Sequence, residues 1–152
     1  MSKKSSLELL KHNAPQSLGL LEHCIRHKSW WDTVDGLASK LVGCVVGANA
    51  ELLPVMEAWN RDPDLWIRRA SLLYQLKYKP PQLDLQRQFC YVRNLMGEED
   101  FFIRKAIGWV LREHSKIDQP TCDAVKEFIT AHQSQLSSLS IREGSKYLNP
   151  TN

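Results

Sequence analysis

Apolar residues recur at helical spacing along most of the chain. Two such series are Leu65, Leu72, Leu73 and Leu76, and Phe102, Ala106, Trp109 and Val110. Residues three or four positions apart lie on one face of an α-helix, so each series predicts a buried helical face. No alternation of apolar and polar residues is long enough to build a β-sheet. The pattern therefore predicts an all-α protein, with helices near residues 32–46, 50–60, 65–77, 84–96, 101–116 and 120–134.

Two segments align without a gap and indicate an internal repeat. Residues 64–70 read DLWIRRA, and residues 100–106, which lie 36 positions later, read DFFIRKA. A weaker copy begins at Ser29, where Trp31 stands 35 residues before Trp66. Each copy is followed by a second amphipathic segment, at residues 51–59, 85–96 and 121–132. A period of this length with two helices in each unit is typical of a solenoid of helical hairpins.

Capping residues and prolines indicate where these helices begin and end. Ser29 and Asp32 form a capping box in front of the helix predicted near residues 32–46. Gly47 and Gly97 stand where helices should stop, and Pro80-Pro81 breaks the chain between two hairpins. We expect a single domain over residues 1–152, made of about four hairpins.

Composition narrows the class of protein without identifying a ligand. The net charge of the 152 residues is +3, which permits an anionic partner without requiring one. No apolar stretch approaches the roughly 18 residues of a membrane helix, and the charged start lacks the apolar core of a secretory signal. The four cysteines are scattered, as in proteins of a reducing compartment. We expect an intracellular protein without a membrane partner, in the cytoplasm of a prokaryote or in the nucleus or cytoplasm of a eukaryote.

The sequence gives no indication of metal or nucleotide chemistry. His23 and His27 are four residues apart, but no third ligand, cysteine pair or H-E-x-x-H sequence accompanies them. The chain also has no Walker-type glycine loop, no G-x-G-x-x-G and no G-x-S-x-G sequence. We therefore expect no cofactor and no metal site.

Trp31 and Asp35 are the first candidates for chemistry. In a helix that starts near Trp30, they lie at positions i and i+4 and share one face. The tryptophan ring offers its negative face to a positively charged ligand or transition state, and the carboxylate offers a full charge. The alternative interpretation is structural, with Trp31 in the core and Asp35 as an exposed helical acid.

Cations accompany two further segments. Arg68 and Arg69 are adjacent and point about 100° apart around the helix, so one could reach a phosphate while the other pairs with a neighbouring helix. Lys105, Trp109 and Arg112 share a face at i, i+4 and i+7, which places one aromatic ring between two cations. The alternatives are solvated arginines and a tryptophan that only fills the core. Glycine at position 108 costs about 1 kcal/mol of helix propensity, which indicates close packing there.

Taken together, these segments resemble the AlkD-type DNA alkylation-repair glycosylases. The matching segments are 28–35 (KSWWDTVD), 66–70 (WIRRA), 75–79 (QLKYK), 101–113 (FFIRKAIGWVLRE) and 139–143 (LSIRE). They occur in the family's order across almost the whole chain, and the KSWWDxVD and FFIxKAIGW runs are specific. The resemblance implies a right-handed superhelix of antiparallel, HEAT-like (ARM-type) helical hairpins with a basic concave surface that holds duplex DNA.

The resemblance also implies an activity and roles for individual residues. The family cleaves the N-glycosidic bond of purines alkylated at N3 or N7, so we expect a monofunctional DNA glycosylase, a hydrolase that acts in DNA repair. Trp31 and Trp109 match the two tryptophans that flank the deoxyribose of the lesion, and Asp35 matches the catalytic acid. Arg69 matches the arginine that contacts the backbone beside the lesion. The expected phosphate contacts are Arg69, Lys77, Arg112 and, from the charge pattern, Lys105, whereas Arg104 receives no role.

The chain departs from the family at its start. Family members usually carry further N-terminal helices that meet the DNA, whereas here only one hairpin precedes Trp31. We expect these N-terminal repeats to be absent, with duplex DNA that contains alkylated purines as the ligand. Self-association or a partner protein could replace the missing helices. Two other interpretations stay open: a noncatalytic DNA-binding relative, and a HEAT-like adaptor that binds protein on its concave face.

Overall fold

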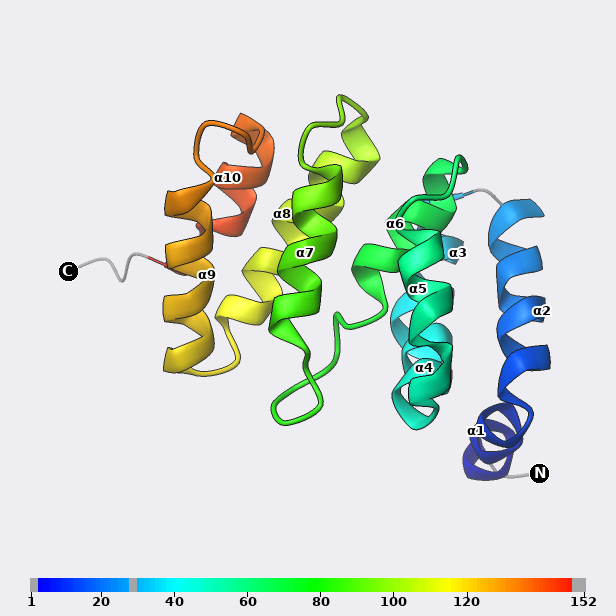
Figure 1. Cartoon of the computed structure of the whole chain (residues 1–152). Helices are drawn as coiled ribbons and strands as arrows, with labels where there is room; N and C mark the ends of the chain where they lie inside the picture. Colours follow the sequence, from blue (N-terminus) through cyan, green and yellow to red (C-terminus); the bar gives the residue numbers. More distant parts are fainter. Residues whose placement is uncertain (1–2, 28–29, 149–152) are drawn as a thin grey trace. The chain divides into compact units, whose positions relative to one another are not determined.

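The computed structural model describes residues 3–27 and 30–148, with side chains from residue 6 onward (Figure 1). Every regular element in these ranges is a helix, which confirms the predicted all-α class. The elements are α1 (Lys3–His12), α2 (Ala14–His27), α3 (Trp31–Gly36), the π-helical η1 (Leu37–Val42), α4 (Gly43–Ala48), the 3-10 helix η2 (Ala50–Leu52), α5 (Leu53–Trp59), α6 (Leu65–Leu73), α7 (Leu85–Leu95), α8 (Phe101–Ser115), α9 (Gln119–Ala131) and α10 (Ser138–Gly144).

The helices gather into two compact units, Met1–Tyr78 and Lys79–Asn152. The boundary lies one residue before Pro80-Pro81, where the sequence predicts a break between two hairpins. In the first unit, α2 contacts α1, η1, α4 and α6, and α6 also contacts α3 and α5. In the second unit, α8 contacts α9 and α10, and α9 runs back along α8 as the second arm of a hairpin (Figure 1).

Each predicted helix has a counterpart in the structure. The helix predicted near residues 32–46 is a continuous segment from α3 through η1 to α4. The helix predicted over 65–77 is shorter, because regular α-helix ends at Leu73. After Leu73, the backbone N–H of Leu76 donates a hydrogen bond to the carbonyl oxygen of Leu73, and the backbone N–H of Tyr78 donates one to the carbonyl oxygen of Gln75. These three-residue hydrogen bonds tighten the chain into turns.

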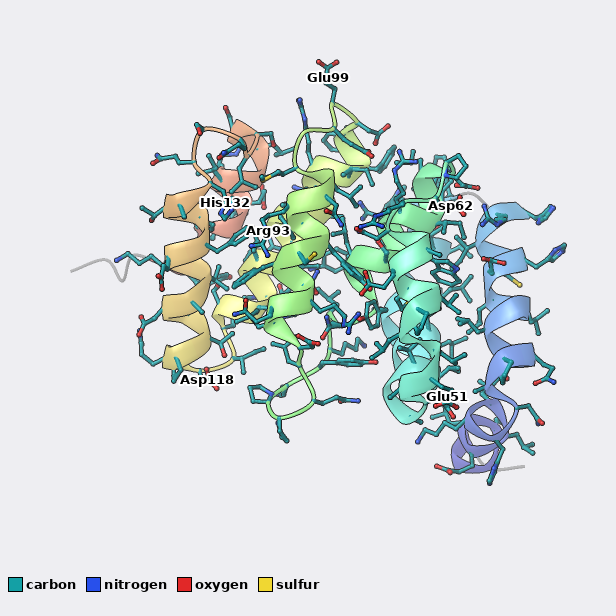
Figure 2. All side chains as sticks on the ribbon, in the orientation of Figure 1. Glu51, Asp62, Arg93, Glu99, Asp118 and His132 are labelled. Carbon is teal, nitrogen blue, oxygen red and sulfur yellow. The ribbon has the colours of Figure 1, made fainter. Side chains whose placement is uncertain are left out.

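Aspartate side chains cap four successive helices. Asp64 accepts a hydrogen bond from the backbone N–H of Trp66, and Asp100 accepts one from that of Phe102. These two caps are the acids that open the aligned repeat segments. Asp84 and Asp118 cap α7 and α9, and Asp118 marks the start of α9 in Figure 2. An N-cap contributes about 1 kcal/mol to the stability of the folded state, so each cap fixes the residue at which its helix begins.

The capping box predicted from Ser29 involves a residue outside the described ranges. The residue at the N-cap of α3 is Trp30, which has an extended backbone and makes no side-chain capping bond. Asp32 instead accepts a hydrogen bond from the amide of its neighbour Thr33. The first turn of α3 therefore begins without the cap that the aspartates supply elsewhere.

Two glycines permit close contacts between helices. A Cβ atom on Gly43 would lie 2.6 Å from the backbone oxygen of Tyr74. A Cβ atom on Gly108 would lie 2.7 Å from the Cβ of Glu143 in α10. Contacts this short exclude any side chain larger than hydrogen. The close packing that the sequence predicted at Gly108 is therefore confirmed, and its partner is α10.

No single helix among the described residues is long and apolar enough to cross a membrane. One pair, Trp31–Ala48 with Ala50–Trp59, meets the length and composition only when its two arms are taken together, and the arms are bent by 115°. Apolar residues of this pair are buried within the first unit, among them Val34, Val42, Val45, Met56 and Trp59.

Candidate functional site

Asp35 and Arg69 form a buried, two-pronged ion pair in the first unit. Nε of Arg69 donates to Oδ1 of Asp35 at 2.8 Å, and Nη2 donates to Oδ2 at 3.0 Å. Asp35 is 7% exposed and Arg69 is 3% exposed. The planar guanidinium matches the two carboxylate oxygens, so this geometry fixes both the position and the orientation of the carboxylate.

Local helical structure sets the position of Asp35. It is on α3, which packs on α6, the helix that carries Arg69. The π-helical segment η1 begins two residues after Asp35, and the hydroxyl of Ser39 donates to the backbone oxygen of Asp35 at 2.7 Å. A wider π turn alters the direction of the side chains around it, and such turns are frequent at functional sites.

The tryptophans beside Asp35 are open to solvent. Trp31, one helical turn before Asp35, is 45% exposed, and Trp30 is 64% exposed. The structural alternative from the sequence placed Trp31 in the core and Asp35 on the surface, and both parts of it are wrong. An accessible aromatic ring thus precedes a buried, oriented carboxylate on the same short helix.

The two adjacent arginines of α6 have different partners. Arg68 donates through Nη1 to the backbone oxygens of Asp62 and Pro63, both at 2.9 Å. In the aligned repeat, Nε of Arg104 donates to the backbone oxygen of Glu98, also at 2.9 Å. The first cation of each repeat therefore secures the loop before its own helix. The one that pairs with a neighbouring helix is Arg69, which in this structure is directed to Asp35 rather than to solvent.

The second cation of the other repeat, Lys105, also meets a carboxylate. Nζ of Lys105 lies 3.3 Å from Oε1 of Glu143, and Nη1 of Arg112 donates to Oε2 of the same residue at 2.9 Å. Nζ of Lys146 is 3.2 Å from that Oε2. Hydrogen bonds from Lys146 and Lys105 hold the pKa of the Glu143 carboxyl below its ordinary value. Trp109 is half-buried and lies between Lys105 and Arg112 on α8.

Sequence reasoning missed Glu143 as a member of this cluster. In the sequence it stands only as the last residue of the closing helical segment 139–143. The signal that could have found it is Gly108, since the close packing it predicts brings some residue of another helix against α8. Only the structure identifies that residue as an acid 31 positions after Arg112.

The candidate residues are divided between the two units. Trp31, Asp35, Arg69 and the exposed Lys77 belong to the first unit, and Lys105, Trp109 and Arg112 belong to the second. The structure joins Asp35 with Arg69, and it joins Lys105 with Arg112 through Glu143. The convergence of Trp109 with Trp31 and Asp35 stays a prediction. Within residues 3–27 and 30–148, no group of three or more metal-ligating side chains could hold an ion.

Comparisons with known proteins found a matching family and a similar solved structure. The sequence matches the family of DNA alkylation repair enzymes over residues 4–148. It is also similar to the solved structure of a predicted DNA alkylation repair enzyme from Enterococcus faecalis, with 30% identity and a TM-score of 0.76. That match covers 98% of this chain and 69% of the Enterococcus chain. A comparison with curated proteins gave no match.

Proposed function

Since the chain belongs to the family of DNA alkylation repair enzymes, we propose that it is a monofunctional DNA glycosylase for purines alkylated at N3 or N7 in duplex DNA. The observation that carries the proposal is the buried Asp35, held by Arg69 through two hydrogen bonds beside the exposed ring of Trp31. A helical scaffold does not need a buried carboxylate next to an exposed aromatic ring, whereas a site that meets a cation does.

The chemistry needs an oriented negative charge. An N3- or N7-alkylated purine is already positively charged, and it leaves with the electron pair of the N-glycosidic bond. Positive charge then develops on the deoxyribose, and a water molecule adds to C1′ and releases a proton. A fixed carboxylate stabilises that charge and can orient the water. Arg69 engages one lone pair on each oxygen of Asp35, so each oxygen retains a second one.

Aromatic residues would bind the sugar and its developing charge. The face of a tryptophan ring attracts cations, and the effect is larger where water is excluded. We assign this role to the exposed Trp31 and, from its match to the family motif, to Trp109. The residues that would contact phosphates of the DNA backbone are Lys77, Lys105 and Arg112. Arg69 would orient Asp35 and lie next to the DNA backbone.

The test is release of methylated purines from alkylated duplex DNA. Asp35→Asn keeps the size of the side chain and an oxygen that can accept from Arg69, and it removes the charge. Excision by the folded variant, checked by its unfolding curve, should fall by about 10²-fold or more. Duplex affinity should stay the same or rise, because a negative charge near phosphates is lost. Asp32→Asn is the matched control, since Asp32 is exposed on the same turn of α3, and it should excise normally.

Two results would contradict the proposal in different ways. If the wild-type protein binds duplex DNA and releases no base, the chain is a noncatalytic DNA-binding relative. If Asp35→Asn excises as fast as wild type, an enzyme remains but another group stabilises the charge.

Trp109→Ala should weaken both binding and excision, because packing and placement of the sugar would be lost together.

A further inference from the structure

Three cations of the second unit, Lys105, Arg112 and Lys146, contact the carboxylate of Glu143. We call these four residues the Glu143 cluster. The carboxylate is 7% exposed, whereas the side chains of Lys105 and Lys146 are 43% and 50% exposed. The acid therefore lies beneath its cations, and the outer side of the cluster is positive. Within these four residues the positive charges exceed the negative charge by two, and Glu113, whose Oε1 lies 3.5 Å from Nε of Arg112, adds one acid at the edge of the cluster.

The cations retain donors that Glu143 does not use. An ammonium group has three N–H donors, and the contacts of Lys105 and Lys146 with Glu143 engage one on each. Arg112 has five donors, and its contacts within the described chain are with Glu143 through Nη1 and with Glu113 through Nε, at 3.5 Å. Several donors are thus held close together for a ligand with several acceptor oxygens.

The packing of α10 on α8 fixes the cluster in place. Gly108 allows α10 to approach until a Cβ atom at this position would be 2.7 Å from the Cβ of Glu143. A Cβ atom on Gly144 would likewise lie 3.1 Å from the Cβ of Leu111. Because both backbones are close, Glu143 has little freedom, and its carboxylate provides a fixed point that the three cations contact before any ligand arrives. Ordering in advance lowers the entropic cost of binding.

We propose that Lys105, Arg112 and Lys146 form a binding site for one phosphodiester group of the DNA backbone, with Glu143 as its built-in counter-ion. A phosphodiester carries one negative charge and acceptor oxygens that suit an arginine fork with flanking ammonium groups. Trp109 lies on the same helical face between Lys105 and Arg112, where it would meet the adjoining sugar. The ligand rests on the proposed function, while Lys146 and Glu143 extend the proposal to residues that received no role from the sequence.

Binding of unmodified duplex DNA, measured at several salt concentrations, tests this site. Lys146→Ala should weaken binding and reduce the slope of log affinity against log salt by about one, the value for one phosphate contact. Lys146→Arg should restore both. Lys126→Ala removes an exposed lysine of α9 outside the cluster and is the matched control, with wild-type affinity and slope expected.

Glu143→Gln separates a counter-ion from a purely structural acid. Loss of the charge should lower the melting temperature, since three cations would repel one another, and should tighten duplex binding by about threefold or more. A purely structural acid would lower stability without tightening binding, and that result would overturn the proposal. So would a Lys146→Ala variant that binds like wild type, or a Lys126→Ala variant that is weakened as much as Lys146→Ala.

Two further comparisons distinguish this proposal from a free-phosphate site and from the glycosylase proposal. If inorganic phosphate binds wild type but not Lys146→Ala, while Lys146→Ala binds duplex with the wild-type affinity and salt slope, the cluster is a free-phosphate site and the proposal fails. The measurement uses unmodified DNA, so it does not depend on base excision. Salt-dependent binding without excision would defeat the glycosylase proposal alone, whereas normal excision with an unaffected Lys146→Ala variant would defeat this one alone.

Discussion

His114 should make the stability of the protein depend on pH. The imidazole is fully buried in α8, and Nε2 lies 3.2 Å from Oε1 of Gln88, which only accepts a hydrogen bond. Nε2 is therefore the protonated nitrogen of a neutral ring, and Nδ1 has no hydrogen-bond partner among the described residues. Burial lowers the pKa of His114 from 6.5 to about 4, although the charge of Glu113 opposes this.

The sign of the effect follows from the two protonation states. The unfolded chain takes up a proton near pH 6.5, whereas the folded protein does so only near pH 4. Between these values the unfolded state holds more protons, so stability is complete above about pH 7 and is lost as the pH falls. At 1.36 kcal/mol for each pH unit, the full loss is about 3 kcal/mol, of which about 2 kcal/mol falls between pH 7 and pH 5.

Urea unfolding followed by tryptophan fluorescence at pH 7, 6 and 5 measures this loss. His114→Gln removes the titrating group and keeps a donor for Gln88, so its stability should change little over that interval. His23→Gln replaces an exposed imidazole and should keep the wild-type dependence. A His114→Gln variant with the wild-type slope, or an NMR titration in which His114 protonates above pH 6, would refute the reasoning.

Three other substitutions test the packing of the first unit. Arg69→Leu would leave Asp35 buried without its cation and should cost about 3–5 kcal/mol in the free energy of unfolding, and a loss below about 1 kcal/mol would contradict the buried ion pair. Gly43→Ala should destabilise by about 1–3 kcal/mol, because its Cβ would lie 2.6 Å from the oxygen of Tyr74. Gly19→Ala is the control, because no atom lies within 4 Å of its Cβ, and it should stabilise the fold by up to about 1 kcal/mol. Equal effects of the two substitutions on the free energy of unfolding would contradict the close contact between Gly43 and Tyr74.

The helical architecture could be predicted because its signals are local. Spacing of apolar residues and the aligned segments at 64–70 and 100–106 depend only on neighbours within a few turns of helix. The structure explains why both repeat segments begin with an acid, because Asp64 and Asp100 are both N-caps. Sequence reasoning saw two acids in the same register and did not identify the capping role that explains them.

Exposure of the candidate residues could not be predicted in the same way. Helical spacing places Trp31 and Asp35 on one face, but it does not say which of the two meets solvent. That depends on α6, whose Arg69 draws the carboxylate inward and makes its burial tolerable. A buried carboxylate without such a partner would be too costly to keep its charge. The partner lies 34 residues away, beyond the reach of any local pattern.

The repeat itself explains why both candidate clusters have the same chemical form. Arg69 and Lys105 occupy equivalent positions, and each reaches an acid on another helix of its own unit, Asp35 on α3 and Glu143 on α10. The difference is exposure, because Arg69 is 3% exposed while the side chain of Lys105 is 43% exposed. A covered cation can orient its acid, and an open one can also bind an anion. One repeated position thus serves both proposals, the catalytic role proposed for the acid in the first unit and the binding role proposed for the cation in the second.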